Sequence, residues 1–245
     1  MLAIIGGSGL SQLAILEQAN RRVARTPYGE PSGPLTFGRI CGCEVVFLAR
    51  HGYGHTIAPH EVNYRANLWA LKDAGAGEMV SIASVGGIRK DLAPGALAVP
   101  HQIIDYTWGR RSTFFDGPGA AVHHVDFTEP YSAALRQRLL KAAAAAGEKA
   151  ADGAVYAATQ GPRLESAAEI DRLERDGADL VGMTGMPEAA LARELGLHYA
   201  ALAVVANYAA GRGDAGHAIP LDRIEKVLEE AMGRVRRILE KLCAA

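Results

Sequence analysis

Apolar residues occur along this chain in short runs that are rich in branched side chains and alternate with segments of helical periodicity. Several runs are apolar at successive positions, as expected for strands whose two faces are both buried in a layered fold. We therefore predict β-strands over residues Leu2–Ile5, Val45–Ala49, Met79–Val85, Ala96–Ile104, Val155–Ala158, Leu180–Met183 and Tyr199–Val205.

The segments between these runs place apolar residues three or four positions apart, which is the spacing of an amphipathic helix. We predict helices over residues Val62–Ala74, Ser132–Ala146, Ser166–Asp176, Pro187–Leu195 and Leu221–Leu242. Because strands and helices alternate without a low-complexity linker or an internal repeat, we expect one α/β domain over residues 1–245. Residues 109–119 and 211–216 are rich in turn formers and predict long loops, which are often functional.

Composition narrows the class of protein. Acidic and basic residues nearly cancel to a net charge of −1, which argues against a surface built for nucleic acid or membrane. The cysteines are Cys41, Cys43 and Cys243, and a lone C-x-C pair is a poor zinc signature. The chain opens Met-Leu-Ala-Ile-Ile-Gly-Gly, without a basic leader or a long apolar run. We expect a cytoplasmic protein with reduced thiols.

Anion donors follow two of the predicted strands. Gly6-Gly7-Ser8-Gly9 comes after the first strand, where glycines let backbone N–H groups converge and a serine hydroxyl adds a donor. Alone it is as often structural, and it matches neither a dinucleotide fingerprint nor a Walker loop. Arg50-His51-Gly52 follows a second strand and offers a guanidinium fork beside an imidazole. A metal site is the rival interpretation, but no ligand set with suitable spacing lies nearby.

Similar donors follow two further strands, in Ser84-Val85-Gly86-Gly87 and in Met183-Thr184-Gly185-Met186-Pro187-Glu188. Thr184 precedes a helix start, so plain N-capping by its hydroxyl is the structural alternative to anion binding. In open α/β sheets ligands gather beyond the carboxyl ends of strands. Together these segments therefore predict one shared phosphate site.

Two more segments suit a heterocycle. Thr159-Gln160-Gly161-Pro162-Arg163-Leu164-Glu165 supplies a carboxylate, and Asn207-Tyr208-Ala209 supplies a carboxamide. Glutamate accepts a hydrogen bond from a ring N–H, and asparagine both donates and accepts. A solvent-facing glutamate and a turn-forming asparagine are the alternatives.

With these segments in place, the chain resembles the trimeric purine nucleoside phosphorylase family, most closely its methylthioadenosine phosphorylase branch. Residues 49–56 (Ala-Arg-His-Gly followed by His-Thr) and 62–67 (Val-Asn-Tyr-Arg-Ala-Asn) are typical of that branch. Gly161-Pro162-Arg163 and Met183-Thr184 with Pro187-Glu188 mark the wider family. The resemblance, nearly end to end, implies a central mixed sheet flanked by helices. It also implies a homotrimer and inorganic phosphate as co-substrate, with no metal or organic cofactor.

The resemblance also implies residue roles. Arg50 and His51 would position phosphate for attack, and Asn207 would stabilise the purine leaving group. Met183 would lie along the ribose, and His55, with His124 of a neighbouring subunit, would border the 5′ substituent. The full set implied to hold phosphate is Ser8, Arg50, His51, Ala83, Ser84 and Thr184.

Two departures from the methylthioadenosine branch decide the expected base. That branch has Thr-Asp-Tyr-Asp where this chain reads Ala206-Asn207-Tyr208-Ala209, and Phe-Ser where it reads Leu164-Glu165. Glu165 can accept the N1–H that 6-oxopurines have and adenine lacks, and Asn207 can donate to O6 or N7. Adenine would set one acceptor against another, a mismatch that a buried site rejects by roughly 10⁴-fold or more.

The 5′ substituent is expected to be a thiomethyl group, because His55-Thr56 belong to the methylthio frame and Ile219, Leu221 and Ile224 are apolar. The expected reaction is phosphorolysis of S-methyl-5′-thioinosine. Inosine or guanosine phosphorylase and methylthioadenosine phosphorylase are the alternatives within the family. A hydrolytic nucleosidase and a non-catalytic purine-binding module are the rivals outside it. Phosphate dependence of base release would distinguish a phosphorylase from a nucleosidase, and turnover would distinguish an enzyme from a binding module.

Overall fold

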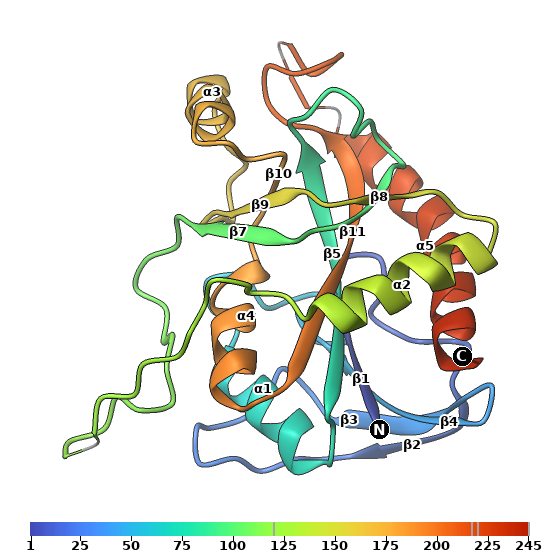
Figure 1. Ribbon diagram of the computed structural model, residues 1–245, viewed down its shortest axis with the longest axis vertical. Coiled ribbons are helices and arrows are strands. Elements are labelled where there is room, and N and C mark those ends of the chain that lie inside the picture. The colour runs from blue at the N-terminus through green and yellow to red at the C-terminus, as the bar shows by residue number, and fades with distance from the viewer. Residues whose placement is uncertain (120, 217, 220, 245) are drawn as a thin grey trace.

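The fold is built on one mixed sheet of eleven strands (Figure 1). The computed structural model describes residues 1–119, 121–216, 218–219 and 221–244, without the side chains of residues 221 and 222. The strands are β1 (Leu2–Gly6), β2 (Glu17–Arg22), β3 (Leu35–Ile40), β4 (Cys43–Ala49), β5 (Glu78–Gly87), β6 (Leu97–Val99), β7 (Gln102–Asp105), β8 (Ala150–Asp152), β9 (Val155–Ala158), β10 (Leu180–Gly182) and β11 (His198–Tyr208).

The centre of the sheet is parallel. β1 pairs with β4 on one side and with β5 on the other, and β5 pairs in parallel with β11 along most of its length. β3 and β2 continue the sheet beyond β4 as antiparallel strands. β10 pairs antiparallel with the end of β5, where Leu180 lies opposite Gly87, and leads to β9 and β7. The carboxyl ends of β1, β4, β5 and β11 therefore point the same way.

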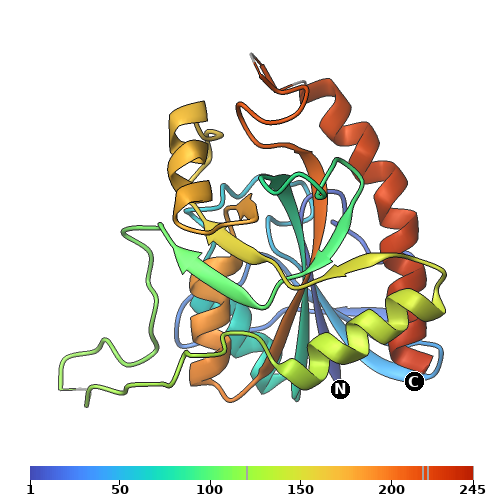
Figure 2. The same ribbon diagram turned by 45° about the horizontal axis from the view of Figure 1, so that its top comes forward.

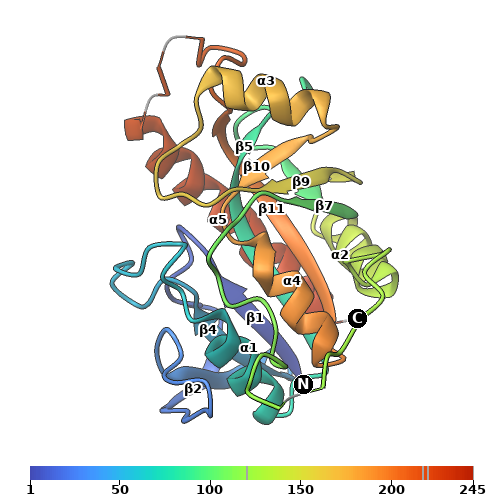
Figure 3. The same ribbon diagram turned by 90° about the vertical axis from the view of Figure 1, so that its left-hand side faces the viewer.

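Helices cover both faces of the sheet. α1 (Tyr64–Asp73) and α4 (Gly185–Glu194) lie together on one face (Figure 3), and α2 (Ala133–Ala145) packs beside α5 (Leu221–Ala244) on the other (Figure 2). α3 (Ala167–Arg175) lies near the end of β10. None of the described helices is long and apolar enough to cross a membrane.

Alternation within β1 divides the core into two layers. Ala3 and Ile5 belong to the cluster that packs against α1 and α4, whereas Leu2 and Ile4 belong to the cluster that packs against α2 and α5. Successive side chains of a strand point to opposite faces, so a strand covered on both sides must be apolar throughout. Each fully buried branched side chain contributes about 1.5–3 kcal/mol to the free energy of unfolding.

The predicted α/β class, with a mixed sheet flanked by helices, is confirmed, and each predicted helix is present within a few residues of its expected bounds. The predicted strand Ala96–Ile104 is wrong as one element. It divides into β6 and β7 around Pro100, which lacks the N–H that a continuous ladder needs. β2, β3 and β8 were not predicted, and every residue of β2 is exposed, so it has no apolar pattern to read.

Two strands run further than their apolar runs. β5 continues through Gly87, two residues beyond its predicted end, so the segment Ser84–Gly87 lies inside a strand and the expectation that it follows one is wrong. Pairing of Gly86 and Gly87 with β10 on one side and β11 on the other keeps this stretch extended. β11 likewise includes Asn207, which follows a bulge after Val205.

The turn after β1 requires a glycine at position 6, where there is no room for a side chain. A Cβ atom at Gly6 would overlap the carbonyl oxygen of Leu10 and press on the ring of Phe47, whereas one at Gly77 would meet nothing within 4 Å. We predict that Gly6→Ala lowers the free energy of unfolding by at least about 2 kcal/mol through overpacking, and that Gly77→Ala changes it by about 0.5 kcal/mol or less. Urea unfolding of both variants tests this, and equal stability would contradict it.

Candidate active site

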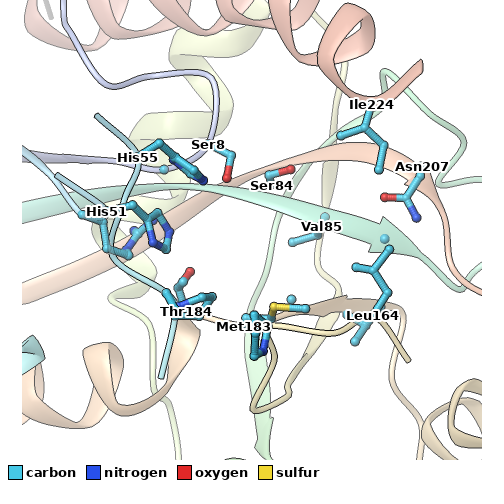
Figure 4. A pocket seen from close by; sticks show the side chains of 18 of the residues that line it. Ser8, His51, His55, Ser84, Val85, Leu164, Met183, Thr184, Asn207 and Ile224 are labelled. Atoms are coloured by element: carbon cyan, nitrogen blue, oxygen red, sulfur yellow. The ribbon is translucent and has the colours of Figure 1, made fainter. Parts of the chain in front are cut away.

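A cavity of about 470 Å³ opens where the carboxyl ends of the central strands meet (Figure 4). Its walls come from the turn after β1, the loop after β4, the end of β5, the loop after β9, the end of β10, β11 and the start of α5. The cavity brings together most of the predicted site residues: Ser8, Arg50, His51, His55, Ser84, Leu164, Glu165, Met183, Thr184, Asn207 and Ala209.

Three predicted residues are not among those lining this cavity. Ala83 is buried in β5 directly before Ser84. His124 is exposed on the segment between β7 and α2, which extends away from the sheet (Figures 1 and 2). The side chain of Leu221 lies outside the described part of the chain, but the nearby Ile219 and Ile224 do line the cavity.

The guanidinium of Arg50 is not free to bind an anion through two nitrogens, so the expectation of a guanidinium fork in the cavity is wrong. Its side chain is 1% exposed. Nε donates to Glu188 Oε2 at 2.8 Å and Nη2 donates to Glu188 Oε1 at 3.1 Å. Nη2 also donates to Ser81 Oγ at 2.6 Å, and Nη1 donates to the carbonyl of Ile82 at 3.2 Å. One N–H of Nη1 is therefore left for a ligand, because a guanidinium has five N–H donors.

His51 is held in one tautomer. Its Nδ1 lies 2.8 Å from the carbonyl oxygen of Ile57, which can only accept, so Nδ1 carries the proton and donates. Burial, reinforced by the charge of Arg50, lowers the pKa of His51 to about 4. At neutral pH the imidazole is uncharged, and Nε2 is an acceptor that can take a hydrogen bond from a protonated phosphate oxygen.

Thr184 occupies the N-cap position of α4, yet its side chain makes no capping hydrogen bond. Plain N-capping, the structural alternative, is thus not what its hydroxyl does. The side chain lines the cavity, near Ser8 and His51 in the view of Figure 4. Hydroxyls from two separate strand ends therefore converge with the imidazole on one side of the cavity.

The other end of the cavity carries the predicted base-reading pair. Thr159 Oγ1 donates to Glu165 Oε1 at 2.6 Å, which fixes the carboxylate and leaves Oε2 free to accept from a ligand. Asn207 Nδ2 donates to the carbonyl oxygen of Tyr208 at 2.7 Å, leaving Oδ1 and one N–H available. The bulge before Asn207 places it at the cavity, in keeping with the tendency of bulges to re-aim side chains at active sites.

Arg110 is a site residue that the sequence did not reveal. Its Nη1 donates to the carbonyl oxygens of Met183 at 2.8 Å and Met186 at 2.6 Å, and its Nη2 donates to those of Thr159 at 3.2 Å and Gln160 at 2.9 Å. The guanidinium thus ties the strand end that carries Met183 to the loop that carries Glu165. Arg110 has no acidic partner among the ion pairs of the described residues, so no acidic residue in the sequence indicates its role.

Among the residues that the structure describes, no three His, Cys, Asp or Glu side chains are grouped so that they could hold a metal ion. The ionisable side chains that line the cavity are Arg50, His51, His55 and Glu165. What the cavity offers is a set of hydroxyl, amide and imidazole groups at one end and a carboxylate with a carboxamide at the other. Such a site can bind an oxyanion beside a heterocycle.

Comparison with known proteins places the chain among phosphorylases. Residues 1–244 match the family described as Phosphorylase superfamily. A protein of Pseudomonas syringae pv. tomato named probable S-methyl-5′-thioinosine phosphorylase is 54% identical over 243 residues, which cover 99% of this chain and 98% of that protein. The 6-oxopurine nucleoside phosphorylase of Pyrococcus furiosus is 45% identical over 215 residues, covering 86% of this chain and 80% of that protein.

A solved structure gives the same result for the fold. Methylthioadenosine phosphorylase from Schistosoma mansoni in complex with adenine superposes with a TM-score of 0.94 at 33% sequence identity. The match covers 99% of this chain and 90% of that one.

The contribution of Arg110 to stability can be tested by comparing substitutions of Arg110 and of its neighbour Arg111. Arg110→Met would leave several part-buried carbonyls without a donor, and we predict a loss of about 2–4 kcal/mol in the free energy of unfolding. Arg111 is 74% exposed and pairs only with Asp116 among the described residues, so Arg111→Met should cost about 0.5 kcal/mol or less. Chemical denaturation measures both. Similar losses in the two variants would show that Arg110 ties nothing together.

Proposed function

The chain belongs to the phosphorylase superfamily, and from that premise we propose that its cavity cleaves S-methyl-5′-thioinosine with inorganic phosphate. The products are hypoxanthine and 5-methylthioribose 1-phosphate. The observation that carries this proposal is the pairing, in one cavity, of an oxyanion end with a Glu165 and Asn207 end suited to a 6-oxopurine. Relatives named for methylthioinosine and for 6-oxopurine nucleosides support the same substrate class.

Phosphate binds at the end formed by Ser8, His51, Ser84 and Thr184, with the free N–H of Arg50 Nη1 beneath it. A Cβ atom at Gly7 would lie 2.9 Å from that Nη1, so the glycine keeps this approach open. Arg50 and His51 are held by hydrogen bonds before phosphate arrives, so these two side chains need little reorganisation during the reaction. Ala83 contributes through the backbone of β5 next to Ser84.

The purine binds at the opposite end. Glu165 accepts N1–H through the oxygen that Thr159 leaves free, and Asn207 donates to N7 or O6. Adenine has no proton on N1, so its lone pair would face a carboxylate that Thr159 holds in place. Leu164 and Ala209 complete the walls around the base.

The sugar lies between the two ends. Met183 borders the ribose, and its backbone amide donates to a sugar hydroxyl. Ile224 and Ile219, with His55, enclose the 5′ group. The apolar side chains of Ile219 and Ile224 favour a thiomethyl group over a 5′-hydroxyl at this position.

The reaction proceeds by loosening of the glycosidic bond, which gives the ribosyl group oxocarbenium character. Phosphate, held below the anomeric carbon, stabilises this cation and attacks it, so the C–N bond breaks as a C–O bond forms. Asn207 stabilises the negative charge that develops on the purine as it leaves, and the proton that hydrogen phosphate loses on forming the sugar phosphate ends on the purine, which gives neutral hypoxanthine. Positioning and electrostatics supply the catalysis, and no step requires a metal or an organic cofactor.

The homotrimer and the cytoplasmic location are further parts of this proposal. The segment between β7 and α2 carries exposed large apolar side chains, with Trp108 72% exposed and Val122 79% exposed. Exposed apolar side chains on a projecting segment are typical of subunit contacts. His124 lies beside Val122, so the partner's copy of this segment would bring His124 to the 5′ end of the cavity.

The substrate assignment is tested by base release from methylthioinosine, methylthioadenosine and inosine, each with and without phosphate. We predict phosphate-dependent release of hypoxanthine, with kcat/KM highest for methylthioinosine. Preference for inosine would favour the second candidate, a general 6-oxopurine nucleoside phosphorylase such as the relative from Pyrococcus furiosus. Efficient cleavage of methylthioadenosine would contradict the role of Glu165 and Asn207, and release without phosphate would indicate a hydrolase.

Base selection is tested by changing the carboxamide. Asn207→Asp restores an acid that can carry a proton to N7, so we predict measurable cleavage of methylthioadenosine and at least about a tenfold loss in kcat/KM for methylthioinosine. Asn20→Asp, an identical change on the exposed strand β2, is the matched control and should alter neither activity. If Asn207→Asp gains no activity on any adenine nucleoside, the account of base selection is wrong.

A further inference from the structure

The phosphate end of the cavity carries almost no unmatched positive charge. Arg50 is the one lysine or arginine among the described residues that line it, and Glu188 holds its guanidinium through two nitrogens. His51 donates from Nδ1 to a backbone carbonyl, and its pKa of about 4 keeps it neutral at physiological pH. A site proposed to bind a dianion therefore relies on neutral donors.

Glu188 is placed where solvent cannot screen its charge. Both Glu188 and Arg50 have side chains that are 1% exposed. Tyr199 donates its hydroxyl to Glu188 Oε1 at 2.8 Å, so each carboxylate oxygen has a protein donor. Within such an interior a unit charge acts over several ångströms with much less attenuation than in water. The charge of the Glu188 carboxylate therefore acts electrostatically on any anion that binds next to Arg50.

Stability alone does not account for this pair. Burying an ion pair removes two charges from water, and well-packed apolar residues of the same size are often equally stabilising. Arg50 and Glu188 lie 138 positions apart in the sequence, and Arg50 itself lines the cavity. The location points to a role in the chemistry above it.

We propose that Glu188 is the counter-ion of Arg50 that holds the phosphate end near neutrality, so that bound phosphate keeps its negative charge for the ribosyl cation. This inference rests on the proposed phosphorolysis. An unpaired Arg50 would bind phosphate more tightly in the ground state and neutralise the charge that must act at the anomeric carbon. Only interactions stronger in the transition state accelerate the chemical step, so that extra affinity would slow turnover.

A purely structural role makes the opposite prediction. If Glu188 merely anchored the guanidinium, its loss would leave Arg50 misplaced and phosphate binding would weaken. If Glu188 sets the charge, its loss strengthens phosphate binding while kcat falls. The sign of the change in phosphate affinity therefore separates the two roles.

The experiment is phosphate binding to Glu188→Gln by isothermal titration in the absence of nucleoside. We expect the Kd for phosphate to fall about tenfold, the size expected for one uncompensated charge in a partly buried site. We also expect kcat for methylthioinosine to fall at least about tenfold, so that kcat and KM for phosphate decrease together. Unchanged or weaker phosphate binding would overturn the proposal.

Two control variants separate charge from packing. Tyr199→Phe removes a neutral donor from the same carboxylate oxygen and keeps the charge, so the Kd for phosphate should stay within about twofold of the parent value. Glu188→Asp keeps the charge on a shorter side chain and should not tighten phosphate binding. Tightening in either control would show that the effect comes from lost packing and would overturn the proposal.

A double variant covers the case in which Glu188→Gln fails to fold. Arg50→Met with Glu188→Met replaces the pair by apolar side chains, a change that buried pairs often tolerate. It removes no net charge and only one phosphate donor, so phosphate should bind within about tenfold of the parent. A loss beyond a hundredfold would mean that Arg50 supplies net charge to phosphate and would overturn the proposal.

Failure of the proposed function is distinguishable from failure of this inference. Absence of phosphate-dependent cleavage by the unmodified protein would reject the function. The comparison of phosphate Kd values needs no nucleoside and tests the charge of the site by itself.

Discussion

Parallel pairing of β4, β1, β5 and β11 is the constraint on which the site depends. Each of these strands is buried on both faces, and their common direction brings their carboxyl ends to one edge of the sheet. The turn after Gly6, the loop that begins at Arg50 and the bulge at Asn207 therefore meet, although long stretches of sequence separate them. A cavity forms at that edge because the strand ends diverge into loops.

The cavity has two chemically different ends, and different side-chain interactions position the groups at each end. At the end proposed for phosphate the Arg50–Glu188 pair is buried, and hydroxyl and imidazole groups line the cavity. At the purine end Thr159 fixes Glu165. Arg110 joins the two walls by donating to carbonyl oxygens on both, so hydrogen bonds to the backbone hold the strand end with Met183 against the loop with Glu165. Under the proposed function, a near-neutral phosphate end and a rigid purine end would suit a reaction in which charge develops between them.

Much of the sheet and of the candidate site could be predicted from the sequence, because strands buried on both faces have unbroken apolar runs, as in Val45–Ala49. Residues directly after such runs could be placed at one edge of the sheet, which is how Ser8, His51, Thr184 and Asn207 were found. The exposed strand β2 left no signal, and Pro100 divided an apolar run that read as one strand. Partners that are distant in the sequence could not be predicted. No residue near Arg50 in the sequence indicates Glu188, and most hydrogen bonds of Arg110 go to backbone carbonyl oxygens, which every residue has.

The measurement that tests the central claim most directly follows the oxygen atoms of phosphate. The protein is incubated with methylthioinosine and phosphate labelled with ¹⁸O at every oxygen, and ³¹P NMR is recorded as hypoxanthine appears. Attack by phosphate at the anomeric carbon predicts a sugar phosphate that keeps all of its ¹⁸O and forms in equal amount to hypoxanthine. Release of hypoxanthine while the labelled phosphate signal stays unchanged would contradict the account.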